Sequence, residues 1–290
     1  MFSSYSYFSR KYMPFVPIAL FAKFCTDIKV METLQYSFPN IQYRGAPMKI
    51  ITANDYDELS SIAANQIHQL INEKPNCVLG LATGSTPVGM YASLVEKYRE
   101  GLINFSNVTS INLDEYCGLT PTHPQSYRYF MNQNLFDHVN IPVGNTYVPA
   151  GTEQDASVAC SDYDRIINKF GPIDLQVLGI GHDGHIGFNE PADFFTPDTH
   201  CVELTPMTID ANKRFFSSYD EVPKKAYTMG IRPIMQAKTV LLLVSGKEKA
   251  HILKNALVGP ITPDIPASIL QLHTNLIVIA DKEALSEMNG

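Results

Sequence analysis

The sequence has few basic residues for its length and gathers none of them into a cluster. It contains 22 Lys and Arg against 29 Asp and Glu, a formal net charge of -7, and no run of five or more basic residues. Binding to a nucleic-acid backbone requires a concentrated basic face. We therefore expect no nucleic-acid partner, and an anionic ligand must meet a few local cations instead.

Long apolar runs and cysteine pairs are also missing. A membrane-spanning helix needs about 20 consecutive apolar residues, whereas the longest apolar candidate after the first 47 residues, Val240–Val244, is only strand-sized. The five cysteines are odd in number, scattered, and form no CxxC pair, which is typical of reduced thiols. We expect a soluble, cytoplasmic protein without membrane contacts.

Residues 1–47 differ in composition from the rest of the chain. They are rich in Ser, Tyr and Phe and contain no acidic residue before Asp27. Prolines interrupt the short apolar stretch Pro14–Ala22, and no clean cleavage site for a secretory signal follows it. An acid-poor start with Ser and Arg also fits an organelle-transit segment. We interpret residues 1–47 as a poorly ordered extension in front of a single domain, residues 48–290.

Apolar segments of strand length alternate with helical segments after Met48. Within Asp57–Glu73 the apolar residues recur near helical spacing, which predicts an amphipathic helix. This alternation predicts an α/β fold with a doubly wound, mostly parallel sheet, which binds ligands beyond the carboxyl ends of its strands. The expected strands are Lys49–Thr52, Cys77–Ala82, Val108–Leu113, Leu175–Gly179, Thr239–Val244 and Leu276–Ala280.

Small and hydroxylated residues, Thr83, Gly84, Ser85 and Thr86, follow the second of these strands. We expect Ser85 or Thr86 to cap a helix whose first residue is Pro87. The backbone N–H groups, the hydroxyls and the positive end of the helix would form a cradle for a phosphate. An ordinary capped helix start is the alternative.

Two adjacent acids, Asp114 and Glu115, follow the third strand. A carboxylate at that edge can act as a general base on a carbon-bound proton next to a carbonyl or imine. Helix capping or ion pairing is the alternative role for such an acid. We assign the base to Asp114 and a structural role to Glu115.

The glycine-rich stretch Gly179–Pro191 contains a literal GxGxxG directly after a strand. A dinucleotide site would need a helix that begins inside these glycines. Gly187 and Pro191 leave no room for that helix, so we expect no nucleotide cofactor. His182 and His185 lack the helical backing of familiar zinc motifs, so we expect no metal either.

His185 remains, flanked by the acids Asp183 and Glu190. Nearby carboxylates favour the imidazolium form and raise the pKa of the histidine. Such a histidine is suited to protonating a ring oxygen. Lys249, after a buried strand, and Arg214, on a loop, are the candidate phosphate ligands.

In this order, these segments resemble the glucosamine-6-phosphate deaminase family over nearly all of residues 48–282. The resemblance implies a Rossmann-like sheet, no organic cofactor, and conversion of glucosamine 6-phosphate and water into fructose 6-phosphate and ammonia. The phrases that carry it are Leu81–Pro87, Leu113–Tyr116, Gly184–Pro191, Phe215–Phe216 and Gln271–His273.

The resemblance also implies a role for each candidate residue. Asp114 would move a proton between C2 and C1 of the open-chain sugar, and His185, held by Asp183 and Glu190, would open the ring. A mobile lid would span about residues 204–224. The 6-phosphate would be held by Thr83, Gly84, Ser85, Thr86, Arg214 and Lys249.

Two departures from the family bear on assembly and regulation. The sequence ends soon after the last strand, which favours a monomer or small homo-oligomer over the hexamer of larger members. Regulated members bind an effector phosphate through basic residues after the catalytic loop, whereas Asp193–Glu203 contains no Lys or Arg.

Two alternative functions share the fold. The 6-phosphogluconolactonases carry Thr-Ala-Ser-like residues where this chain has Ile186–Glu190. A sugar-phosphate-sensing regulator would need a helix-turn-helix, which residues 1–47 do not supply.

Overall fold

The computed structural model describes residues 48–213, 216 and 218–288, all within one compact unit. The N-terminal extension and Arg214 therefore lie outside the described residues. Within these ranges no helix is both long and apolar enough to cross a membrane. The four cysteines in this part of the chain are free thiols.

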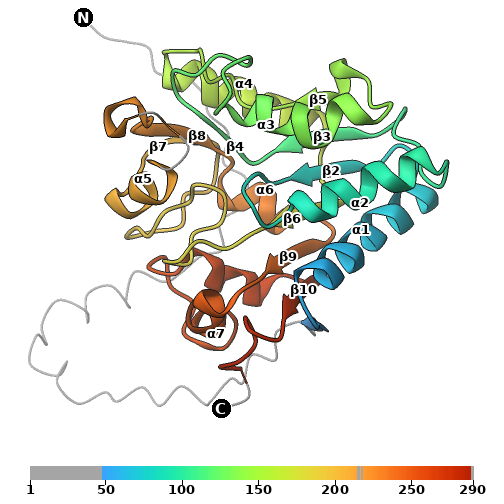
Figure 1. Ribbon diagram of the computed structural model, residues 1–290. Helices are drawn as coiled ribbons and strands as arrows, with labels where there is room; N and C mark the ends of the chain where they lie inside the picture. The colour runs from blue at the N-terminus through green and yellow to red at the C-terminus, as the bar shows by residue number, and fades with distance from the viewer. Residues whose placement is uncertain (1–47, 214–215, 217, 289–290) are drawn as a thin grey trace, which may run out of the picture. The chain divides into compact units, whose positions relative to one another are not determined.

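A seven-stranded sheet forms the centre of the unit, with every neighbouring pair of strands parallel. The strand order is β1-β10-β9-β6-β2-β3-β5 (Figure 1). This confirms the predicted parallel α/β sheet and all six predicted strands. The two-residue β5 was not predicted. The strands are β1 (Lys49–Ala53), β2 (Val78–Leu81), β3 (Thr109–Asn112), β5 (Thr146–Tyr147), β6 (Leu175–Leu178), β9 (Val240–Val244) and β10 (Leu276–Asp281).

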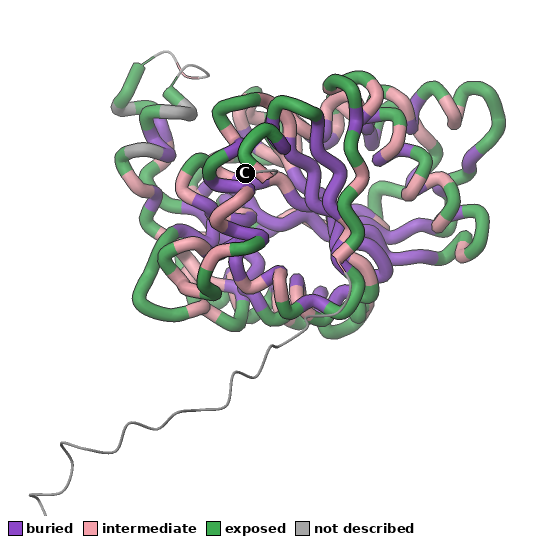
Figure 2. Tube along the Cα trace, turned by 90° about the horizontal axis from the view of Figure 1, so that it is seen from below, coloured by how far each residue is buried: buried purple, intermediate pink, exposed green. Residues whose placement is uncertain are grey.

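Burial explains why β2, β9 and β10 are almost entirely apolar. Every residue of β9 is buried, because layers on both faces of a parallel sheet exclude water (Figure 2). Helices α1 and α2 lie side by side (Figure 1), and α1 packs against β1, β9 and β10. The α-helices are α1 (Tyr56–Glu73), α2 (Val88–Arg99), α3 (Tyr127–Asn134), α4 (Ala156–Phe170), α5 (Pro206–Asn212), α6 (Ile231–Gln236) and α7 (Ala250–Val258). The 3-10 helices are η2 (Phe136–His138), η3 (Val143–Asn145), η5 (Tyr219–Glu221), η6 (Lys247–Lys249) and η7 (Pro266–Leu272).

A second, antiparallel sheet has the order β4-β8-β7. Its strands are β4 (Asp114–Tyr116), β7 (His200–Glu203) and β8 (Lys225–Thr228). Leu113 joins the two sheets: its N–H donates to the Leu81 carbonyl, and its own carbonyl accepts from the Met229 N–H. A separate small core lies here, formed by Tyr116, Phe188, Leu204, Ile209, Val222 and Ala226. The region between β7 and β8, which includes α5, thus packs partly on its own core.

The direction of winding reverses next to β2. From β2 the chain continues to β3 and β5 on one side, whereas β6, β9 and β10 fill the sheet on the other side. Such a reversal leaves a crevice at the carboxyl ends of the strands. The loops after β2, β3, β6 and β9 all meet there.

Candidate active site

A cleft of about 860 Å³ opens at the carboxyl ends of the central strands. It brings together nearly all of the predicted site residues that the structure describes. Asp183 and Glu190 do not line the cleft themselves, but both contact His185, which does. The residues that line the cleft include Thr83, Gly84, Ser85, Thr86, Asp114, Tyr127, His182, His185, Thr208 and Lys249.

The loop after β2 forms one wall of the cleft. Gly84 has a φ of +96°, a conformation that side chains other than glycine rarely adopt. The predicted cap was wrong: Pro87 itself occupies the N-cap position of α2 in a helical conformation, and it is the Tyr56 hydroxyl that accepts from the Gly89 N–H of the first turn, at 2.9 Å. The Ser85 and Thr86 hydroxyls are therefore not used as caps, and both residues line the cleft.

Lys249 lines the same cleft from η6, which follows β9. Its Nζ donates to the Ile180 carbonyl at 2.9 Å and lies 3.3 Å from Nδ1 of His182. Burial lowers the pKa of Lys249, with Glu248 and Asp183 opposing that effect.

Asp281 holds the loop that leads from β9 to Lys249, a role that the sequence interpretation missed. Its Oδ2 accepts from the Ser245 hydroxyl at 2.5 Å and from the Gly246 N–H at 3.0 Å. The sequence does contain a signal for this role. Ser245 and Gly246 directly follow the buried strand β9, and Asp281 ends the neighbouring strand β10.

Asp114 lies at the floor of the cleft with a relative exposure of 5%. Burial and the neighbouring Glu115 raise the pKa of Asp114 to about 8, although His185 acts in the opposite direction. A carboxyl with a pKa near the working pH can both accept and return a proton. This position suits the predicted general base.

Glu115 does not line the cleft. Its carboxylate accepts from the backbone N–H groups of Tyr116, Tyr127 and Arg128 at 2.8 to 3.0 Å. Two of these groups belong to the first turn of α3, where a carboxylate stabilises the helix. The geometry agrees with the structural role predicted for Glu115.

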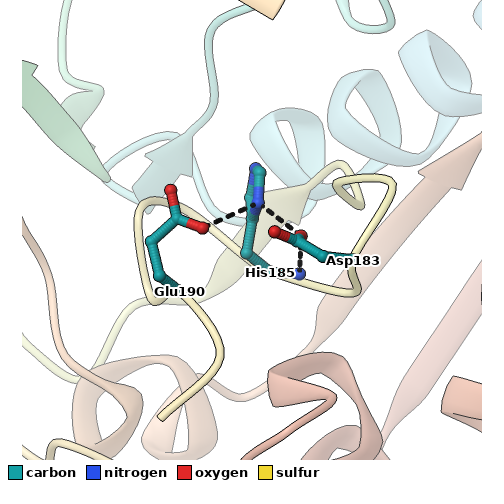
Figure 3. A group of neighbouring side chains, drawn as sticks. All are labelled: Asp183, His185 and Glu190. Atoms are coloured by element: carbon teal, nitrogen blue, oxygen red, sulfur yellow. Dashed lines mark hydrogen bonds and ion pairs between the residues drawn. The ribbon is translucent and has the colours of Figure 1, made fainter. Parts of the chain in front are cut away.

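His185 lies on the loop after β6, between two acids (Figure 3). Its Nδ1 is 2.7 Å from Oδ1 of Asp183 and 3.6 Å from Oε2 of Glu190. The Asp183 carboxylate also accepts from the His185 N–H at 3.1 Å. With Nδ1 directed at the acids, Nε2 is the ring nitrogen left for a ligand. The stretch Gly179–Pro191 contains no helix, as Gly187 and Pro191 predict.

The two acids determine the charge of His185. Burial alone would lower the pKa of His185, but Asp183 and Glu190 outweigh this effect and raise it. Glu190 has a raised pKa because burial dominates over the stabilising contacts with His185 and Thr208. The arrangement therefore favours the imidazolium form more than an isolated histidine would, and this form can donate a proton from Nε2.

The same three residues are also the metal-ligand cluster found among the described residues. Their ligand atoms lie within 4.8 Å of one another. However, Nδ1 of His185 and Oδ1 of Asp183 are 2.7 Å apart, closer than two ligands about 2.0–2.1 Å from one tetrahedral ion would lie. The geometry thus fits an ion pair better than a shared metal.

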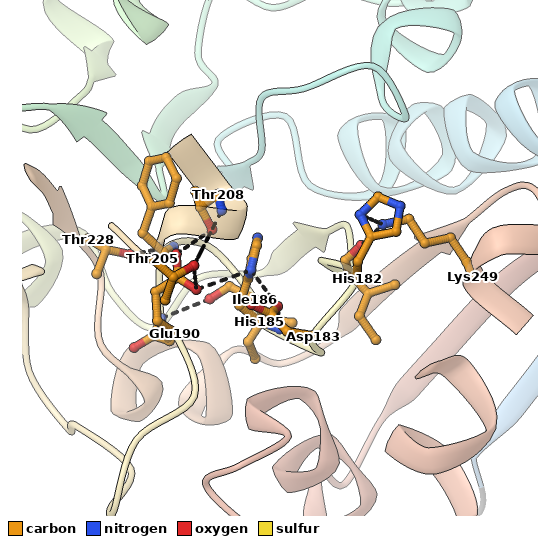
Figure 4. Close-up of polar contacts among 12 residues, drawn as sticks. His182, Asp183, His185, Ile186, Glu190, Thr205, Thr208, Thr228 and Lys249 are labelled. Atoms are coloured by element: carbon orange, nitrogen blue, oxygen red, sulfur yellow. Dashed lines mark hydrogen bonds and ion pairs between the residues drawn. The ribbon is translucent and has the colours of Figure 1, made fainter. Parts of the chain in front are cut away.

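Two threonines in the segment 204–224 complete the contacts of Glu190 (Figure 4). The Thr208 hydroxyl donates to Oε1 of Glu190 at 2.6 Å, and the Thr205 hydroxyl lies 3.5 Å from Oε2. Sequence reasoning missed both residues, because hydroxyls at a helix start are ordinarily read as caps. Thr205 is indeed the N-cap of α5.

Comparison with known proteins places this chain in one family. Residues 54–278 match the family described as glucosamine-6-phosphate isomerases/6-phosphogluconolactonase. Glucosamine-6-phosphate deaminase from Lachnoclostridium phytofermentans is 58% identical over 232 residues, which cover 80% of this chain and 98% of that protein. The corresponding protein from Clostridioides difficile is 53% identical over 242 residues, 83% of this chain and 97% of the relative.

Solved structures give the same result. A monomeric glucosamine-6-phosphate deaminase aligns with a TM-score of 0.81 and 45% identity, covering 83% of this chain and all of that one. A 6-phosphogluconolactonase from Thermotoga maritima, at 22% identity and a TM-score of 0.66 over 81% of this chain and all of that one, shares the fold. The chain therefore belongs to the glucosamine-6-phosphate isomerase/6-phosphogluconolactonase family, within its glucosamine-6-phosphate deaminases.

Proposed function

We propose that this chain converts glucosamine 6-phosphate and water into fructose 6-phosphate and ammonia. The observation that carries the proposal is the pairing of a buried acid, Asp114, with an acid-flanked histidine, His185, in one cleft. The first supplies a base for isomerisation, and the second supplies an acid for ring opening. The similarity to named deaminases over most of this chain supports the same reaction.

Ring opening is the first step. Nε2 of His185 donates a proton to the ring oxygen of the cyclic sugar as the C1–O5 bond breaks, and the C1 hydroxyl gives its own proton to Nε2. Asp183 holds Nδ1 at 2.7 Å and so fixes the orientation of the imidazolium. The product of this step is the open-chain aldehyde.

Asp114 then moves one proton. Its ionised carboxylate removes the proton from C2 while the aldehyde oxygen on C1 takes up the proton held by Nε2 of His185, which gives an enolamine, and the protonated carboxyl then returns its proton to C1. The nitrogen on C2 becomes an imine, water adds to C2, and ammonia leaves as the ketone forms. One base suffices for both transfers because C1 and C2 are neighbours.

The phosphate would lie between the β2 loop and Lys249. Backbone N–H groups and hydroxyls of Thr83–Thr86 can donate to it, and the Lys249 ammonium supplies a positive charge. Arg214, which lies outside the described residues, would add a bidentate contact from the lid. We propose the segment at about 204–224 as that lid, which closes to exclude water from the enolamine.

The proposal includes no organic cofactor and no metal, because proton transfer and water addition account for the whole reaction. We also propose a cytoplasmic monomer or small homo-oligomer, which the likeness to a monomeric deaminase supports. Residues 1–47 would be an extension dispensable for the fold, since the alternating apolar and helical pattern of the sequence begins at Met48.

A 6-phosphogluconolactonase-like hydrolase is the second candidate, since the fold and the cleft are shared. Glu190 argues against it, because this acid contacts the histidine where that family has small residues. The deciding experiment measures ammonia and fructose 6-phosphate formed from glucosamine 6-phosphate, with 6-phosphogluconolactone as the control substrate. Consumption of the lactone alone would overturn the proposal.

A further inference from the structure

Glu190 connects the lid segment to the acid that opens the ring. One of its oxygens, Oε1, accepts from the Thr208 hydroxyl at 2.6 Å, and the other, Oε2, faces Nδ1 of His185 at 3.6 Å (Figure 4). Thr208 is buried and belongs to α5, whereas Glu190 and His185 belong to the loop after β6. The contact therefore joins two segments that are separate in the sequence, the loop after β6 and the first turn of α5.

Thr208 is itself held in place by Thr205. The Thr205 hydroxyl donates to Oγ1 of Thr208 at 3.1 Å and accepts from its N–H at 3.3 Å. Since Oγ1 of Thr208 accepts this bond, its hydroxyl hydrogen is directed to Glu190. The start of α5 thus presents one oriented donor, and this donor reaches Glu190 only when α5 lies where the structure places it.

Glu190 needs that donor to remain a carboxylate. The side chain is only 5% exposed, and Asp183 lies close enough to disfavour a second negative charge. A hydrogen bond to the charged form offsets part of this cost. Without it, Glu190 would tend to hold a proton or turn away, and His185 would lose one of its two anionic neighbours.

We infer that Thr208 is a positioning residue, which keeps Glu190 charged and directed at His185. It can do so only when the lid lies in the position described here. Closure of the lid would therefore be needed before His185 can open the sugar ring. The inference rests on the proposed deaminase function. It assigns the lid a second task besides excluding water. An enzyme built this way would protonate the sugar ring efficiently only after the substrate is enclosed.

The test compares Thr208→Val, which removes the hydroxyl at constant shape, with Thr208→Ser, which restores it. A hydrogen bond to a charged group contributes about 1.5–3 kcal/mol, so kcat of Thr208→Val should fall by roughly ten- to a hundredfold. KM and the inhibition constant of an acyclic amino-alditol 6-phosphate, which needs no ring opening, should stay near wild type. Thr208→Ser should recover most of kcat.

Thr199→Val is the matched control, because the Thr199 hydroxyl is buried and has no hydrogen-bond partner among the described residues. This variant should retain wild-type kcat. Equal rises in KM and in the inhibition constant for Thr208→Val would show a merely structural role, and an unchanged kcat would overturn the inference. If the wild type itself released no ammonia, the proposed function would fail instead.

Discussion

The imidazole of His185 fills the space where a side chain at Gly181 would lie. A Cβ added at Gly181 would overlap the ring atoms of His185. The Gly181 N–H also donates to the His185 carbonyl at 2.9 Å, so the two residues are fixed against each other. The middle glycine of the pattern that resembles a nucleotide motif therefore leaves room for a histidine ring.

Gly181→Ala should displace the imidazole and lower kcat by about 10²- to 10⁴-fold, the usual contribution of a positioned acid. Steady-state kinetics with glucosamine 6-phosphate measure the effect. Gly144→Ala is the control for the substitution itself, since a Cβ there would meet nothing within 4 Å. Wild-type turnover in Gly181→Ala would contradict the placement of His185.

Asp114 should impose a rise of activity with pH. Because the pKa of Asp114 is raised to about 8, the carboxyl of the free enzyme is largely protonated at pH 6 and cannot accept the C2 proton. The value of kcat/KM should increase about tenfold per pH unit below 8 and level off above it. Asp114→Asn should abolish exchange of the C2 proton with solvent while it still binds the substrate.

Asp114→Asn should also change stability in a pH-dependent way. A carboxyl whose pKa is raised by folding stabilises the native state fully only below its unfolded pKa, about 4, and that contribution is lost as pH rises toward 8. The asparagine does not titrate. The melting temperature of the variant relative to wild type should therefore be higher at pH 8 than at pH 5, and an equal difference at both values would refute the buried, protonated acid.

A strong chelator should leave the activity unchanged. The Asp183–His185 pair is too close for both groups to ligate one ion without moving, as described above. Dialysis against the chelator, followed by an ammonia assay with and without added zinc, measures this. Activity that disappears and returns with zinc would assign a metal to the cluster of Asp183, His185 and Glu190.

N-acetylglucosamine 6-phosphate should not activate the enzyme. Glu190 also lines a second cavity of about 290 Å³. None of the described residues that line this cavity is a Lys or Arg. His200 is the lining residue that could become a cation, but burial lowers the pKa of His200 and so disfavours its charged form. Rate against substrate should be hyperbolic with and without the effector; sigmoidal curves that become hyperbolic on its addition would contradict this.

The apolar strands of the central sheet were predictable because buried parallel strands leave a continuous apolar signal. The second sheet was not, since β4, β7 and β8 are three or four residues long and largely polar. His185, Asp183 and Glu190 are close together in the sequence, so their grouping could be predicted from it. Thr208 and Asp281 act from distant segments, and only the folded chain brings their hydroxyl and carboxylate to the site.

Leu113 has a mechanical consequence for the base that follows it. This residue bonds to β2 through its N–H and to Met229, at the end of β8, through its carbonyl, so the strand carrying Asp114 is anchored in both sheets. Because Asp114 is the next residue, its position is tied to both sheets. A displacement of α5 that leaves these two hydrogen bonds intact would therefore leave the proposed base in place.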